Sequence, residues 1–122
     1  MIKYEIISFK LPQTKSLDVD FVIQEIEGII NTYGLNITQK TTRSTLKGSI
    51  HYHLKQGEDA GVLELTYWVS KHRLWTEIHD NRLADWNKDM IVPFTQALAD
   101  CFCGESINAN KWEPFSLKPF HC

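Results

Sequence analysis

Three consecutive segments of the chain alternate between apolar and polar residues. One face of each segment carries mainly apolar side chains, which are Ile50, Tyr52 and Leu54, then Leu63, Leu65, Tyr67 and Val69, then Leu74, Thr76 and Ile78. Successive side chains of a strand point to opposite faces, so this period of two indicates half-buried strands. The sequence therefore predicts an antiparallel meander with one face against a core.

The turns between these segments predict how the strands pair. A loop at residues 57–60 would place Leu54 opposite Leu63, and a two-residue turn at residues 71–72 would place Val69 opposite Leu74. In this register the face away from the core carries three cross-strand rows, which are His53, Glu64 and His79; His51, Thr66 and Glu77; and Ser49, Trp68 and Trp75.

The flanking segments predict two helices and two further strands. Residues 2–9 are rich in strand-forming types, helical spacing runs from Val19 to Tyr33 with Gly34 after it, and residues 35–47 fit a short strand. A second helix is expected within residues 85–103, beginning or kinking near Pro93. The predicted fold class is a single α+β domain over residues 1–122, in the order β-α-β-β-β-β-α plus a C-terminal tail, with both helices on one face of the sheet.

Composition narrows the function classes. The 122 residues are 43% hydrophobic and 23% charged, with a formal net charge of −2, which argues against binding of nucleic acid through bulk phosphate attraction. Apolar runs are too short for a membrane span, and the first residues lack an export signal, so we expect a cytoplasmic protein without a membrane partner. Glycine-rich nucleotide motifs are absent from the sequence, and we predict no cofactor.

The row with two tryptophans predicts a protein-interaction surface. Trp68 opposite Trp75, beside Thr66 and Glu77, would expose two indoles that are costly to leave in water. Either the C-terminal tail with Trp112 and Phe115 covers them, or a second copy or another protein does. Our first hypothesis is therefore a non-enzymatic inhibitor, immunity-type or adaptor domain that binds a protein or itself through this face.

The row of His53, Glu64 and His79 predicts a different chemistry. Two imidazoles flanking a carboxylate can hold Zn²⁺ or Fe²⁺, or can act as an acid–base pair without metal. The alternative hypothesis is thus a small metal-dependent or acid–base enzyme, with His51 and Glu77 in support, although His–Glu pairs are also common on an ordinary solvent face. A second zinc hypothesis, from Cys101, Cys103, His121 and Cys122, has poor spacing, and Cys101 fits better as a small core residue.

Overall fold

The structure is a computed structural model and describes residues 1–10 and 18–110. Over these ranges the chain forms β1 (Ile2–Ile7), α1 (Asp18–Thr32), β2 (Asn36–Thr41), β3 (Ser49–Lys55), β4 (Leu63–Trp68), β5 (Arg73–Ile78), α2 (Asp85–Cys101) and β6 (Glu105–Asn108). Two short 3₁₀ turns, η2 (Val69–Lys71) and η3 (Asp80–Arg82), follow β4 and β5. The predicted α+β class and element order are confirmed, and β6 is a strand within the segment that we expected to be a tail.

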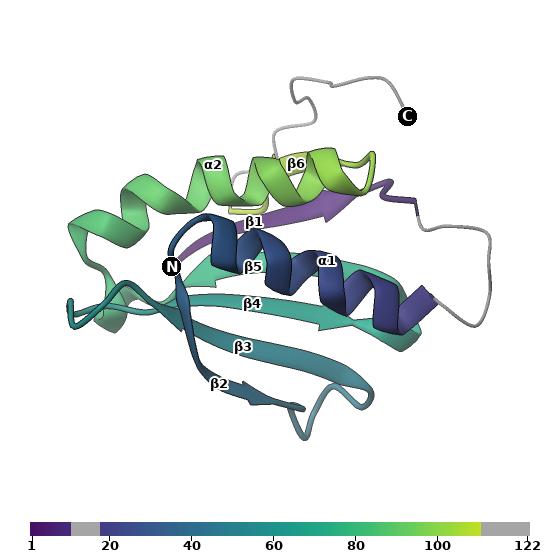
Figure 1. Cartoon of the computed structure of the whole chain (residues 1–122), viewed down its shortest axis with the longest axis horizontal. Helices are drawn as coiled ribbons and strands as arrows, with labels where there is room; N and C mark the ends of the chain where they lie inside the picture. Colours follow the sequence, from purple (N-terminus) through teal and green to yellow (C-terminus); the bar gives the residue numbers. More distant parts are fainter. Residues whose placement is uncertain (11–17, 111–122) are drawn as a thin grey trace.

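The six described strands form one antiparallel sheet in the order β2-β3-β4-β5-β1-β6. The meander β2-β3-β4-β5 is continuous in sequence, whereas β1 pairs with β5 and places the N-terminal segment inside the sheet. Figure 1 shows β2 at one edge and the short β6 beyond β1 at the other. The strands that carry the histidines therefore lie in the sheet interior, with a neighbour on each side.

Both helices pack on the same face of the sheet. Val22, Ile26 and Ile30 recur every four residues of α1, which places them on one helical stripe, and all are at most 1% exposed. They join one core with Ile91, Phe94 and Leu98 of α2 and with the apolar strand positions Tyr52, Leu54, Leu63, Leu65, Tyr67, Leu74 and Ile78. The predicted alternation of buried apolar positions is thus confirmed.

Polar side chains within this layer fix the helices against the strands. The Tyr52 hydroxyl donates to the Glu27 carboxylate of α1 at 2.9 Å, and the hydroxyls of Thr76 and Thr95 lie 2.6 Å apart between β5 and α2. Buried hydroxyls need such partners, because an unpaired one would cost more than the bond itself contributes.

The helix boundaries follow from local signals. Gly34, two residues after the last residue of α1, adopts φ +72°, a left-handed conformation that glycine reaches without a Cβ penalty, as predicted. The helix α2 begins at Asp85, where the Asn87 side chain accepts from the Ala84 backbone N–H at 3.0 Å, and it continues through Pro93. Within the described residues, neither helix has the length and apolarity that crossing a membrane requires.

One of the two predicted strand registers is wrong. Leu54 pairs with Leu63 as expected, but Leu74 pairs with Tyr67 instead of Val69. The connection contains the 3₁₀ turn Val69–Lys71 and His72 at φ +53°, so it is longer than a two-residue turn. A shift of two residues keeps every side chain on its predicted face, although it changes which residues stand opposite one another.

Candidate metal centre

The face of the sheet away from the helices carries a cluster of imidazoles and carboxylates. Alternation places His51 and His53 of β3 on this face, and the confirmed register sets His53 opposite Glu64 of β4. The corrected register sets Glu77 of β5 opposite Glu64 on the other side, and His79 follows directly after β5. Glu64 is therefore flanked on both sides by groups that can ligate a metal.

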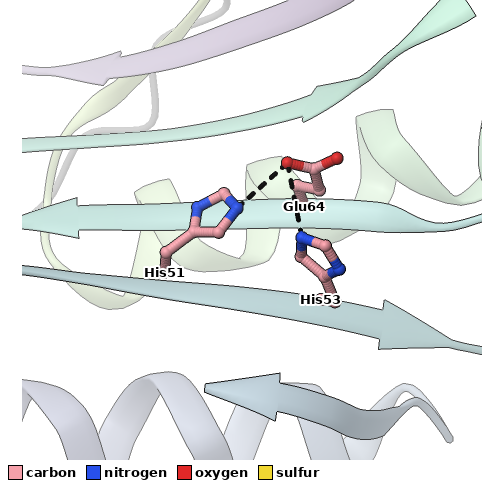
Figure 2. Close-up of side chains that lie close together, drawn as sticks. All are labelled: His51, His53 and Glu64. Carbon is pink, nitrogen blue, oxygen red and sulfur yellow. Dashed lines mark ion pairs between the residues drawn. The ribbon is translucent and has the colours of Figure 1, made fainter. Parts of the chain in front are cut away.

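The distances around Glu64 are short. His51 Nε2 lies 3.0 Å and His53 Nε2 3.8 Å from Glu64 Oε1, while His79 Nε2 lies 3.5 Å from Glu64 Oε2. Figure 2 shows both imidazoles of β3 directed at the same oxygen of Glu64. Two sets of three residues have ligand atoms within 4.8 Å of one another, namely His51, His53 and Glu64, and then Glu64, Glu77 and His79.

The cluster is largely shielded from water but open on one side. The side chains of His51 and Glu64 are 7% and 6% exposed, whereas those of His53 and His79 are 19% and 40% exposed. A small ligand can therefore approach along His53 and His79, while His51 and Glu64 form the inner wall.

A further layer of contacts orients the cluster. His51 Nδ1 lies 2.7 Å from the hydroxyl of Thr66, which is fully buried, so Nε2 is left facing Glu64. The Trp75 indole N–H donates to Glu77 Oε2 at 3.2 Å, and an Arg43 guanidinium nitrogen lies 3.7 Å from the same oxygen. Hydrogen-bonded histidine and carboxylate side chains of this kind are typical around metal ligands.

Electrostatics set the charge states of Glu64 and His53. Burial acts to raise the pKa of Glu64, but the hydrogen bond with His51 and the nearby imidazoles of His79 and His53 outweigh it and lower the pKa. Burial lowers the pKa of His53, and the attraction of Glu64 does not compensate. An ionised carboxylate beside a neutral imidazole is the state in which both groups ligate a metal.

The predicted triad of His53, Glu64 and His79 is therefore divided between the two sets. Glu64 belongs to both, His53 lies with His51, and His79 lies with Glu77. The sequence named all five residues but assigned His51 and Glu77 supporting roles, because the assumed register put His79 directly opposite Glu64 and left His51 and Glu77 in the neighbouring row. The corrected register puts Glu77 there.

The predicted pair of tryptophans does not form. Trp75 stands opposite Thr66 and Trp68 opposite Arg73. Trp75 is only 4% exposed, with the Lys3 ammonium 4.8 Å and the Arg73 guanidinium 4.9 Å from its ring centroid. Trp68 is partly exposed and donates its indole N–H to the Lys47 carbonyl at 2.9 Å. Cations from β1 and β5, not a second indole, thus lie over Trp75.

The cysteine hypothesis gains no support from the described residues. Cys101 is exposed, contrary to our expectation of a core position, and its thiol lies 3.5 Å from a Glu25 carboxylate oxygen. Partial desolvation by the neighbouring atoms, together with the hydrogen bond and charge of Glu25, raises the pKa of this thiol to about 11, which disfavours the thiolate that zinc requires. Cys103 is disulfide-bonded. His121 and Cys122, like Trp112 and Phe115 of the predicted covering tail, lie outside the described residues.

In comparisons with known proteins, no family model, curated protein or solved structure matches the chain.

Proposed function

We propose that this protein binds a divalent transition metal ion, with Zn²⁺ as the best fit, through His51, His53 and Glu64. The observation that carries the proposal is the spacing of the ligand atoms around Glu64 Oε1. Zinc–nitrogen and zinc–oxygen bonds of 2.0–2.2 Å place tetrahedral ligands about 3.4 Å apart. The separations of 3.0 and 3.8 Å bracket that value.

The surroundings support the same proposal. His51 Nε2 and Glu64 Oε1 face each other at 3.0 Å, and such a close approach of two potential acceptors needs a proton or a cation between them. In the tautomer that donates Nδ1–H to Thr66, the lone pair of Nε2 is available to a metal. Three protein ligands would leave one coordination position for water on the side of His53 and His79.

The chemistry open to such a centre is that of a Lewis acid. A metal with three protein ligands and one open position lowers the pKa of its bound water towards neutrality, or polarises the oxygen of a bound substrate. Two further groups beside the centre, the half-exposed imidazole of His79 and the buried carboxylate of Glu77, suit proton transfer to or from that water. We therefore favour the enzyme hypothesis in its metal-dependent form.

The experiment is a zinc titration of the full chain, purified without a histidine tag. Isothermal titration calorimetry with ZnCl₂ should give a saturable site, and His53→Ala should weaken it by at least tenfold. The matched control is His72→Asn, because His72 lies outside the cluster at φ +53°, which asparagine tolerates. Equal zinc binding by the wild type, His53→Ala and His72→Asn would refute the proposal.

A protein partner or a second copy of this chain is the alternative proposal. Of the four residues first assigned to that surface, Thr66, Trp75 and Glu77 are at most 5% exposed, so a partner would contact mainly Trp68. Sedimentation of the wild type and Trp68→Ala tests self-association, and identical monomeric behaviour of both would exclude a dimer through this residue.

The cytoplasmic location stays a prediction.

A further inference from the structure

We infer that Glu64 is a bridging carboxylate that serves two metal ions, the second held by Glu64, Glu77 and His79; this inference rests on the metal binding proposed above. The two ligand sets share Glu64 and no other residue. Five side chains from three adjoining segments thus form two neighbouring sites instead of a single one.

The two oxygens of Glu64 face different partners. Oε1 is approached by His51 and His53, whereas Oε2 lies 3.5 Å from His79 Nε2. Figure 2 shows the second oxygen directed away from both imidazoles of β3. The 3.5 Å separation again agrees with the spacing of about 3.4 Å between ligands of one tetrahedral ion. A carboxylate that offers one oxygen to each side has the geometry of a bridge.

Glu77 supplies the second carboxylate in an orientation that its neighbours fix. Its Oε2 accepts from the Trp75 indole and lies 3.7 Å from an Arg43 guanidinium nitrogen, so Oε1 is the oxygen that would ligate the second ion. Glu64 and Glu77 also stand directly opposite each other in the sheet, both at most 5% exposed. Like charges in this position repel, and a divalent cation between them would convert the repulsion into attraction.

The inferred ligand is a second divalent cation that accepts carboxylate oxygen as well as imidazole nitrogen, as Zn²⁺ does. The first site offers two imidazoles and one carboxylate oxygen, while the second offers one imidazole and two carboxylates and is the more exposed. Zn²⁺ can occupy both donor sets, because it binds histidine nitrogen and carboxylate oxygen alike. Paired metals bridged in this way lie about 3.5–4 Å apart and act together on one oxygen-containing substrate.

The test measures metal stoichiometry in full-length, tag-free protein after equilibrium dialysis against ZnCl₂, with metal determined by elemental analysis. The wild type should hold two zinc ions per chain. His79→Ala and Glu77→Gln should each hold one, His53→Ala should lose the ion of the first site, and His72→Asn should still hold two. Circular dichroism verifies that each variant is folded.

Each outcome has a distinct meaning. One zinc ion in the wild type that is unaffected by His79→Ala and Glu77→Gln would overturn the bridge and leave the proposed function intact. A wild type that binds no zinc at all would overturn both the bridge and the proposed function. Should the glutamine variant fail to fold, X-ray absorption of the zinc-loaded wild type decides, because a bridged pair requires a zinc–zinc distance of about 3.5–4 Å and its absence refutes the pair.

Discussion

Replacing Thr66 with valine tests whether the contact behind His51 supports metal binding. The Thr66 hydroxyl lies 2.7 Å from His51 Nδ1, and both residues are buried, at 0% and 6% exposure. Valine has nearly the same shape, so the change removes the hydrogen bond with little change in packing. An unpaired buried imidazole nitrogen costs about 1–3 kcal/mol of unfolding free energy. Loss of a contact that orients a metal ligand weakens metal binding by about 10–100-fold.

The fold provides a matched control for this variant. Thr76 is also fully buried, but it faces the helices, where its hydroxyl lies 2.6 Å from that of Thr95. Urea unfolding should show that Thr66→Val and Thr76→Val both lose stability, while calorimetry with ZnCl₂ should show weaker binding for Thr66→Val alone. Equal zinc affinity in the two variants would refute the assigned role of Thr66.

Three further predictions concern stability. Phe94→Ala should lower the unfolding free energy measured in urea by about 3–5 kcal/mol, because Phe94 is fully buried. Val92→Ala, at a half-exposed position of the same helix, should change it by less than about 0.5 kcal/mol. Similar losses in the two variants would contradict the core assignment. Gly61→Ala should lower the unfolding free energy by more than about 1 kcal/mol, because Gly61 has φ +97° and an added Cβ would lie 2.7 Å from the Cβ of Ala84. Gly28→Ala in α1 has open space around the added Cβ and should raise the melting temperature. The pKa of Glu64 is lowered in the folded protein, so its ionised form stabilises the fold fully above pH 4.5, and this stabilisation is lost as the pH falls through the lower folded pKa. Glu64→Gln should therefore reduce the loss of unfolding free energy at acidic pH. An unchanged loss at acidic pH would count against the paired carboxylate.

The sequence predicted the faces of the sheet better than the pairing of its strands. Alternation alone assigned His51, His53 and Glu64 to one face, and the short loop after β3 fixed Leu54 opposite Leu63. The pairing of β4 with β5 was wrong by two residues, because registers that differ by two leave the same side chains on each face. Only the conformation of the Val69–Lys71 turn separates them, and no residue in it carries a strong turn signal.

Long-range pairing explains what the sequence could not show. Trp75 is covered because β1 pairs beside β5 and brings Lys3 to the indole, a contact across most of the chain. The strand β6 has only four residues and is defined by its pairing with β1, so it has no pattern of its own. The ion pair of Arg43 and Glu77 is likewise long-range, because Arg43 lies in the loop between β2 and β3, and Glu77 lies in β5, two strands from β3 in the sheet.

Crystals of the zinc-loaded protein, measured at the zinc absorption edge, test the central claim most directly. The account predicts an anomalous difference peak within about 2.2 Å of His51 Nε2, His53 Nε2 and Glu64 Oε1. Zinc peaks confined to other parts of the surface, with His51 and Glu64 in direct contact, would contradict it.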